Sequence, residues 1–435
     1  MGSFSTRSLI LYLAVSCVYV PRKYLSVLGC SDSYLSRAIK SAIGKGFITK
    51  SVITERVRYR NVQEEFYQIT GEGLHYLAKR KATLPEEIQW VGELFSWVKN
   101  FAWLKERPLK GSQQMRRYLS VSGTAVFCAA AGCCVPLVFP SNRVDSCELD
   151  IDLDDDDMAF FIGEAERRNA AEDTGNEKVT LTGELLRFIE SEKGREQNPN
   201  GILMNRNSDL VFTNVFEMKR KLREALGQNG NYSGGRFTGV VEGPLKSVLL
   251  YEGKRKGMSW SKWITDLDLR TYRAYINRVS HDKNHQPGFE SGAILVKNAK
   301  MFADLVLKKY GKKQRDEKFA NGFSSFMFFP INAIGAQQFS SYLRIDLNAH
   351  YEKVISDAIE SQAFKRNVGT YQWYFPLITM DGVRMMIGTF LDGVKIQKIL
   401  DIQEIDPFPF GVICFAWQQD YFRRIFPNAL FFTLS

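Results

Sequence analysis

The sequence of 435 residues contains few of the residue types from which most enzyme sites are built. Its four histidines give no indication of a Ser–His–Asp or Cys–His set. Its seven cysteines include no Cys-x-x-Cys pair, so their spacing does not indicate an ordinary closed metal site. No Gly-x-Gly-x-x-Gly is present, and the glycine-rich run from Asn229 to Gly235 lacks the Lys-Ser/Thr that follows it in a P-loop. The commonest nucleotide-binding loops are therefore excluded.

Long apolar runs are also scarce. Residues 118–139 carry no charge over about the length of a membrane-spanning helix, but they are largely Ala, Gly, Ser and Cys, and Pro136 interrupts them. We expect a buried helix followed by a strand there, and no membrane association. The short apolar run from Leu9 to Val15 fits a first helix better than a secretory signal. We therefore expect a cytoplasmic protein with reduced thiols.

The positive charge is distributed unevenly. An apolar fraction of 45% is that of a globular protein, and the length allows two or three domains. The net charge is +10, and residues 1–82 alone hold 13 Lys and Arg against 5 Asp and Glu. Most of the excess thus lies on less than a fifth of the chain, which indicates an anionic polymer as partner.

Residues 31–44 have the pattern of a short amphipathic helix. Ser31 is a good N-cap, and Asp32 places a negative charge in the first turn. Gly44 and Gly46 are expected to end the helix. The apolar face consists of Leu35, Ala38, Ile39, Ala42 and Ile43, and the opposite face of Ser33, Tyr34, Ser36, Arg37, Lys40 and Ser41.

A two-stranded ribbon follows the helix. Ser51–Arg58 alternates in polarity and Glu65–Ile69 returns, with basic residues near the tip, and Thr70 caps a further helix. A short helix followed by a basic hairpin is typical of the recognition helix and wing of a winged helix-turn-helix, in which the helix meets base edges and the wing meets phosphates. The alternative is an ordinary helical subdomain with a solvated basic face. The candidate DNA-binding residues are Ser33, Tyr34, Arg37, Lys40, Arg56, Arg58 and Arg60.

Three segments carry a family resemblance. They read ILYLAVSCVYVPRKYLSVLG, then SDSYLSRAIKSAIGKGFI, then YQITGEGLHYL. In this order they resemble the replication-relaxation winged-helix proteins of plasmids and conjugative elements, over roughly the first 80 residues and more loosely through QQMRRYLSVSGTAVFCAAAG. The resemblance implies binding to double-stranded DNA in replication, relaxation or transfer control, with proteins of such a complex as further partners. Winged-helix proteins often bind paired half-sites as dimers, so a homodimer is an option.

The C-terminal half has the pattern of an α/β domain. Phe237–Val241 and Ser247–Tyr251 are expected to form a hairpin, Leu210–Leu226 and Asp266–Val279 to be helices, and three later segments each to run from strand to helix. These three segments begin at Ala293, Ser325 and Gly411. We expect one mixed sheet covered by helices.

The expected fold class is therefore α/β overall, with an N-terminal winged helix-turn-helix followed by a mixed α/β sheet domain with flanking helices. Expected domain limits are 1–82 for the winged helix, 83–145 for a helical connector, 146–205 for an acidic and polar linker, and 206–435 for the α/β domain. Within the linker, the acidic run Asp145–Asp157 lacks the Gly and Glu positions of an EF-hand, so we expect a solvated loop. A second hypothesis is that it mimics DNA phosphates.

Many relatives in the resembled family end in a domain similar to restriction endonucleases. The Pro-Asp pair of that active site is not found here, but Glu252-Gly253-Lys254 resembles its second half, and Glu242 could supply a second carboxylate, with Asp209 or Glu217 upstream. A magnesium cofactor is implied only if this nuclease alternative holds. His281 and His285 are four residues apart, but their neighbours favour a loop, so no other metal is expected. A third alternative is a transcription regulator whose C-terminal domain binds a partner or a ligand.

Overall fold

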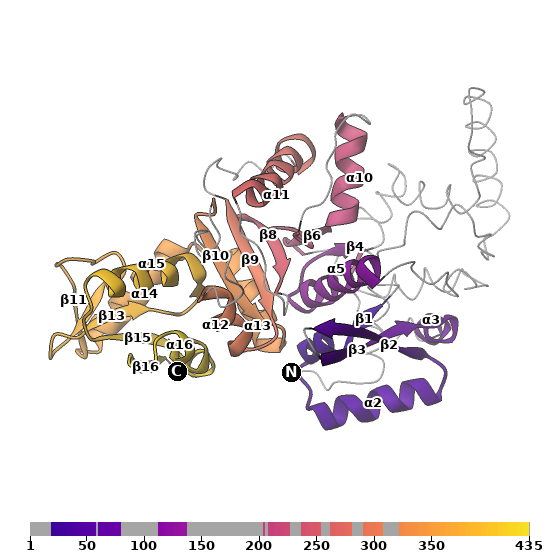
Figure 1. Cartoon of the computed structure of the whole chain (residues 1–435), viewed down its shortest axis with the longest axis horizontal. Helices are drawn as coiled ribbons and strands as arrows, with labels where there is room; N and C mark the ends of the chain where they lie inside the picture. The colour runs from indigo at the N-terminus through magenta and orange to yellow at the C-terminus, as the bar shows by residue number, and fades with distance from the viewer. Residues whose placement is uncertain are drawn as a thin grey trace. The chain divides into compact units, whose positions relative to one another are not determined.

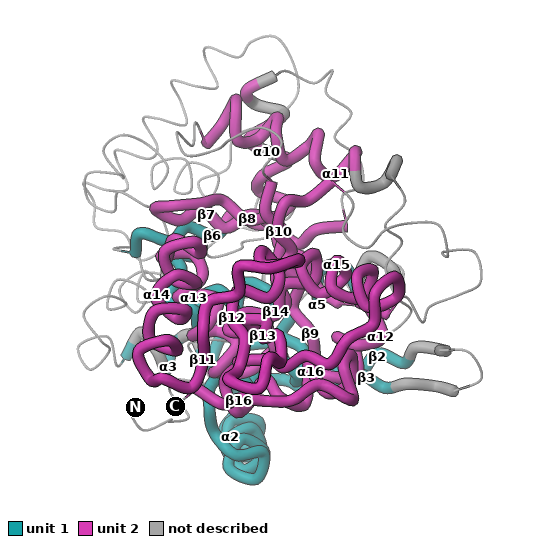
Figure 2. Tube along the Cα trace, turned by 90° about the vertical axis from the view of Figure 1, so that its left-hand side faces the viewer, with its two compact units in different colours: residues 1–212 teal, residues 213–435 magenta. Residues whose placement is uncertain are grey.

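The computed structural model describes residues 19–57, 60–79, 112–136, 203–204, 208–226, 236–253, 262–280, 290–307 and 322–434. The chain divides into two compact units, residues 1–212 and 213–435, and each is described by itself (Figures 1 and 2). Both contain helices and sheet, as expected for an α/β protein. The apolar run Leu9–Val15 expected as a first helix, the acidic run at 145–157 and the histidines at 281 and 285 lie outside the described residues.

Unit 1 begins with a small sheet flanked by helices. Its elements are β1 (Val20–Pro21), the 3₁₀ helix η1 (Arg22–Leu28), α2 (Asp32–Gly44), β2 (Ile48–Val57), β3 (Arg60–Ile69), α3 (Gly71–Ala78), α5 (Ser112–Ala130), β4 (Val135–Pro136) and β5 (Leu203–Met204). The sheet has the order β1-β3-β2, with both pairs antiparallel. The 3₁₀ helix η1 begins directly after Pro21 and ends before Gly29, which has a φ of +69°.

Both ends of α2 are fixed by local signals. The Ser31 hydroxyl accepts a hydrogen bond from the Tyr34 amide at 3.4 Å, which satisfies one of the free amides of the first turn. At the other end Gly46 adopts a φ of +71°, and the Phe47 and Gly46 amides donate to the carbonyls of Ala42 and Ile43 at 2.9 Å. These two bonds form a Schellman cap. Gly44 itself is still helical, so Gly46 is the residue that turns the chain.

The hairpin and α3 are joined to the end of α2 through Thr70. The Thr70 hydroxyl donates to the Gly46 carbonyl at 2.6 Å and accepts from the Gly73 amide at 3.2 Å, so the expected helix cap is confirmed. Gly73 is required by close approach, because a Cβ there would lie 2.4 Å from the Phe47 carbonyl oxygen. Each strand of the hairpin has ten residues, or about 33 Å.

Helix α5 packs on the opposite face of this small sheet from α2. Gly123 lies against the Tyr24 ring, where a Cβ would approach within 2.2 Å, and the Ser122 hydroxyl donates to the Tyr19 carbonyl. Leu119 packs with Tyr19 and Phe66. A buried helix followed by a strand is therefore confirmed for this segment. No helix in the described part of the chain is both long and apolar enough to span a membrane.

Unit 2 contains two mixed sheets. The six-stranded sheet has the order β14-β10-β9-β8-β7-β6, and the five-stranded sheet has the order β11-β12-β13-β15-β16. The strands are β6 (Val211–Asn214, at the boundary of the units), β7 (Gly239–Glu242), β8 (Ser247–Glu252), β9 (Ser291–Val296), β10 (Ser325–Pro330), β11 (Phe364–Arg366), β12 (Leu377–Thr379), β13 (Arg384–Ile387), β14 (Leu391–Asp392), β15 (Phe410–Phe415) and β16 (Leu430–Leu434). The helices are α10 (Val215–Leu226), α11 (Lys262–Tyr275), the π-helix η5 (Ile276–Ser280), α12 (Ala299–Val306), α13 (Ala333–Arg344), α14 (Leu347–Glu360), α15 (Gly393–Ile405), the 3₁₀ helix η7 (Ala416–Gln418) and α16 (Gln419–Ile425).

Three strand-to-helix turns in the six-stranded sheet use the same cap. Asn214 is the last residue of β6, and Asn298 and Asn332 follow β9 and β10. Each side chain accepts hydrogen bonds from the first amides of the next helix, α10, α12 or α13, at 2.8–3.0 Å. Strands β8, β9 and β10 pair in parallel, so these units bury apolar runs between helices. The expected hairpin and the three strand–helix segments are confirmed.

Two expectations about unit 2 are wrong. Val211–Asn214 is a strand and not the first turn of a helix, because Phe212 is buried in the sheet and the Asn214 side chain caps α10. The domain also has two sheets where one was expected. The third strand–helix segment pairs β15 with β13 and β16 in the five-stranded sheet, and the sheets are connected through α12, which packs against α16.

Candidate functional site

The exposed face of α2 is the first candidate site. Leu35, Ala38, Ile39 and Ala42 are buried, and at 100° per residue the positions directly opposite them are Ser33, Arg37, Lys40 and Gly44. Tyr34 lies on one flank at 41% exposure, with the Arg37 guanidinium 5.8 Å from its ring centroid. The structure thus gathers the four candidate residues Ser33, Tyr34, Arg37 and Lys40 on one solvent-exposed side. Ile43, expected in the apolar face, is 39% exposed on the other flank.

The cations on this face are available for an external anion. Among the described residues, neither Arg37 nor Lys40 has a carboxylate within ion-pair distance, whereas Lys50, Lys23 and Arg22 each have one. Asp32 is the one carboxylate of α2, and it lies in the first turn. The middle of the exposed face therefore carries hydroxyl groups and positive charge.

The expected wing residues lie at the far end of the hairpin. The register pairs Arg56 with Asn61 and Val57 with Arg60, so the returning strand begins five residues closer to the tip than the sequence indicated. Arg58 lies outside the described residues, and so do the side chains of Arg56 and Arg60. Their role as phosphate ligands stays a prediction.

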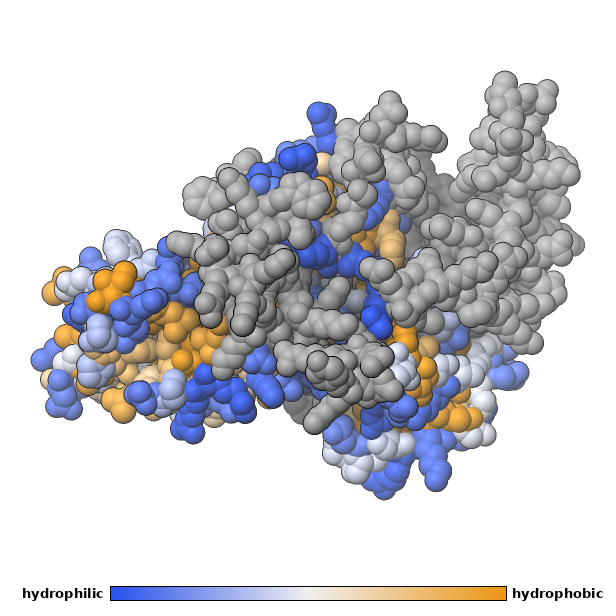
Figure 3. All heavy atoms as spheres, viewed as in Figure 1, coloured by the Kyte–Doolittle hydropathy of each residue, from blue (hydrophilic) through white to orange (hydrophobic). Residues whose placement is uncertain are grey.

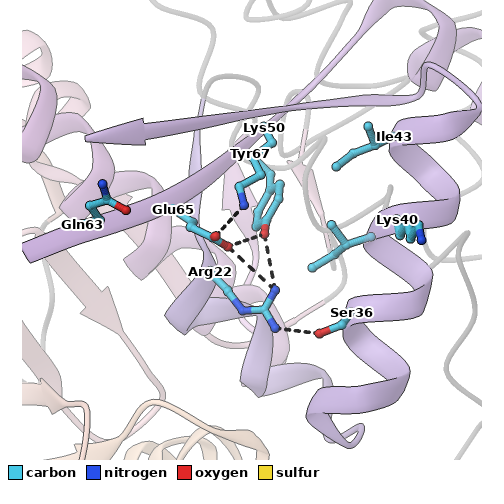
Figure 4. Close-up of a pocket in the computed structure, with 9 residues that line it drawn as sticks. Arg22, Ser36, Lys40, Ile43, Lys50, Gln63, Glu65 and Tyr67 are labelled. Carbon is cyan, nitrogen blue, oxygen red and sulfur yellow. Dashed lines mark hydrogen bonds and ion pairs between the residues drawn. The ribbon is translucent and has the colours of Figure 1, made fainter. Parts of the chain in front are cut away.

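A cleft that the sequence did not reveal lies between α2 and the hairpin. Figure 4 shows its lining side chains, which come from η1, α2 and one face of β2 and β3. Its volume is about 710 Å³, and it is open to solvent. The lining residues are Arg22, Ser36, Ile39, Lys40, Ile43, Lys50, Gln63, Glu65 and Tyr67. Lys40 thus belongs both to the exposed face of α2 and to this cleft.

Glu65 is the centre of the polar network in the cleft. It accepts hydrogen bonds from Lys50 Nζ at 2.5 Å and from the Tyr67 hydroxyl at 2.9 Å, and Arg22 Nη1 lies 4.0 Å from its Oε2 (Figure 4). Arg22 also donates to the Ser36 hydroxyl at 2.8 Å and to Tyr67 at 3.4 Å. Through Arg22 the network connects η1 to α2 and to β3, so it fixes the helix relative to the hairpin.

The network keeps its members ionised. Hydrogen bonds from Lys50 and Tyr67 lower the pKa of Glu65, and the bond to Glu65 raises the pKa of Lys50. The hydrogen bond with Tyr67 raises the pKa of Arg22. The carboxylate and both cations therefore remain charged throughout the neutral range.

The two carboxylates considered for a nuclease site are held apart. Strands β7 and β8 are antiparallel and pair Glu242 with Ser247, five residues before Glu252, which is about 17 Å along the strand. Glu242 accepts hydrogen bonds from the Tyr275 hydroxyl at 3.0 Å and from Ser280, whereas Glu252 is buried beside β9. Hence Glu242 and Glu252 lie at opposite ends of the hairpin and do not converge. Lys254 lies outside the described residues.

The structure also describes the two upstream carboxylates. Asp209 is exposed before β6, and Glu217 lies on α10, 3.9 Å from Lys221. Within the described ranges, no three His, Cys, Asp or Glu side chains gather closely enough to hold a metal ion.

Comparison of the chain with protein-family models, curated proteins and solved structures gives no match. Function is therefore inferred from the geometry of α2 and of its cleft.

Proposed function

We propose that residues 19–79 form a winged helix-turn-helix that binds duplex DNA. In this assignment α2 is the recognition helix, β2 and β3 form the wing, and Ser33, Tyr34, Arg37 and Lys40 meet the DNA. Thirteen residues make a helix of about 20 Å. The major groove is about 12 Å wide and admits such a helix.

One observation carries this proposal. The side of α2 directly opposite its buried face holds Arg37 and Lys40, for which the described residues provide no carboxylate partner. On a solvated helix, opposite charges three or four residues apart stabilise the helix, and α2 has no such pair at Arg37 or Lys40. An unpaired cationic face beside a projecting hairpin supports contact with a polyanion. The further assignment to a plasmid or conjugative element is supported only by the resemblance of residues 10–77 to the replication-relaxation proteins.

The experiment is a fluorescence-anisotropy titration of labelled duplex DNA at two salt concentrations. The variant is Arg37→Ala/Lys40→Ala. Its matched control, Lys365→Ala/Lys398→Ala, removes the same charge from exposed positions of unit 2. A bidentate contact from Arg37 to guanine contributes about 1–3 kcal/mol. We therefore expect the double variant to lose at least about tenfold in affinity and the control less than about twofold.

Two outcomes of this titration would contradict the proposal. Equal losses for the two double variants would show that net charge alone attracts DNA, and the recognition role of α2 would fall. A wild-type protein that binds no duplex would overturn the proposed function. Magnesium is included and product lengths are measured, so that cleavage is detected separately from binding.

A second proposal concerns unit 2, which we assign the role of a protein-interaction platform. Val368 and Trp373 are each 85% exposed and Ile405 is 83% exposed. In the same region Tyr371 stacks on Phe408 at 6.0 Å. Figure 3 shows apolar side chains at the surface near β13 and α15. Exposed aromatic and apolar groups of this kind are enriched in interfaces.

The first partner to test is a second copy of the chain. Sedimentation of wild type and of Trp373→Ser/Ile405→Ser over a range of concentrations measures self-association. We expect the wild type to dimerise and the variant to remain monomeric. A variant that dimerises as tightly as the wild type would exclude this surface from the dimer.

A further inference from the structure

The cleft between α2 and the hairpin carries more positive than negative charge. Arg22, Lys40 and Lys50 line it together with a single carboxylate, Glu65. The hydroxyls of Ser36 and Tyr67 add further hydrogen-bonding groups. Such a lining suits a singly charged anion that accepts several hydrogen bonds, and a phosphate group has this chemistry.

The geometry of DNA explains why a phosphate would reach this cleft. Each sugar–phosphate strand separates the major groove on one side from the minor groove on the other. A protein that places a helix in the major groove and a hairpin tip at the adjacent minor groove must let that strand pass between them. In unit 1 the space between helix and hairpin is this cleft.

In the free protein, the Glu65 carboxylate is the anion that contacts the cations of the cleft. It is the hydrogen-bond partner of Lys50 and Tyr67, and its Oε2 lies 4.0 Å from Arg22 Nη1. Its side chain is 34% exposed, as is that of Arg22, so water and an incoming phosphate both reach the pair. A phosphate bound there would lie close to the carboxylate and would be repelled by it.

We propose that one backbone phosphate of duplex DNA replaces Glu65 as the partner of Lys50 and Arg22, and that Glu65 thereby limits the affinity for DNA. This inference rests on the proposed function and adds to it a phosphate site and a residue that weakens binding. Glu65 acts as an internal counter-anion. It keeps the two cations in place without DNA and competes with DNA for them.

The chain supplies a matched control for the test. Glu64 precedes Glu65 in β3 and pairs with Lys23 at 2.9 Å. Successive strand residues point to opposite faces, so Glu64 lies on the face away from the cleft, and it does not line the cleft. Glu65→Gln and Glu64→Gln remove the same charge from adjacent positions. The glutamine amide can still accept a hydrogen bond from Tyr67, which preserves the local geometry.

Duplex titrations at several salt concentrations compare wild type, Glu65→Gln, Glu64→Gln and Lys50→Gln. Repulsion of about 1 kcal/mol between two solvated charges corresponds to about fivefold in affinity. We expect Glu65→Gln to bind about fivefold more tightly and Glu64→Gln to stay within about twofold of wild type. Lys50→Gln should bind more weakly and lower the salt slope by about one. Equal gains for both glutamate variants, or weaker binding by Glu65→Gln, would overturn the inference.

A second arm separates this inference from the proposed function. Thermal unfolding is recorded in sodium phosphate and in sodium chloride of equal ionic strength. We expect phosphate to stabilise the wild type and to lose this effect in Lys50→Gln. Stabilisation by phosphate without DNA binding would overturn the proposed function and assign the cleft to a free phosphate group. DNA binding with no response to phosphate and no effect of Glu65→Gln would leave the proposed function intact and refute the phosphate site.

Discussion

Gly44 and Gly46 stand two residues apart at the end of α2, and alanine should change the stability of unit 1 in opposite directions at these positions. An added Cβ meets no atom within 4 Å at either site, so packing does not decide the outcome. Gly44 is helical, and alanine there should stabilise by about 0.5–1 kcal/mol. Gly46 has a φ of +71°, where an L side chain costs about 1–2 kcal/mol. The two variants should therefore differ by about 1.5–3 kcal/mol.

The assay combines denaturation with local hydrogen exchange. Urea unfolding of the full chain gives the sign of each change in the free energy of unfolding. The Phe47 amide, which donates to the Ala42 carbonyl at 2.9 Å, reports on the cap itself. Gly46→Ala should accelerate its exchange, and Gly44→Ala should leave it unchanged or slow it.

Two results would refute this reasoning. If both variants destabilised the protein, Gly44 would have to be constrained by something other than helix propensity. If Gly46→Ala were neutral, the left-handed turn after α2 would not be the conformation in solution.

Three further predictions follow from the packing. Asp268→Asn should destabilise unit 2 by about 1–3 kcal/mol in urea, because the fully buried carboxylate holds the partly buried Arg236 at 2.8 Å and asparagine removes the charge from this pair. Burial lowers the pKa of Lys246 from 10.5 to about 8, so the unfolded chain binds more protons between these values and stability rises with pH there. Lys246→Met should reduce that rise in unfolding curves recorded from pH 7.5 to 9.5 without abolishing it, because burial also lowers the pKa of Lys395 to about 8. Ser31→Ala removes the N-cap of α2 and should cost about 1 kcal/mol in the free energy of unfolding.

The helix and the hairpin of unit 1 were predictable because their signals are local. Ser31 at the N-cap, apolar positions at three- and four-residue spacing, and Thr70 before the next helix lie within a few residues of what they determine. The strand–helix segments of unit 2 were predictable for the same reason. Each buries a short apolar run and starts its helix at a capping side chain such as Asn298.

The cleft could not be predicted, because it depends on register. Lys50 and Tyr67 are cross-strand partners, and Glu65 reaches Lys50 only once the pairing of β2 with β3 is known. Arg22 lies 43 residues before Glu65 and meets it through the packing of η1. The exposure of Ile43 could not be predicted either. Its spacing in the sequence fits the apolar face of α2, but in the structure it lines the open cleft and is exposed. Division into two sheets is likewise a property of long-range pairing.

The register of β7 with β8 also gives a test of the nuclease alternative. A metal ion that activates water for phosphodiester cleavage needs at least two converging carboxylates. Pairing of Glu242 with Ser247 leaves Glu252 about 17 Å away, so a single ion cannot bind both. Hydrogen bonds from Tyr275 and Ser280 further hold Glu242 at its own end of the sheet.

We therefore expect that at most one of the two single variants, Glu242→Ala or Glu252→Ala, abolishes any magnesium-dependent cleavage of duplex DNA by this chain. Product lengths on denaturing gels, for each variant after thermal unfolding has confirmed its fold, are the measurement. Loss of cleavage in both folded variants would mean that β7 and β8 adopt another register in the active protein. Because the DNA-binding proposal depends only on unit 1, that result would change the assignment of unit 2 and leave α2 and its cleft as they are.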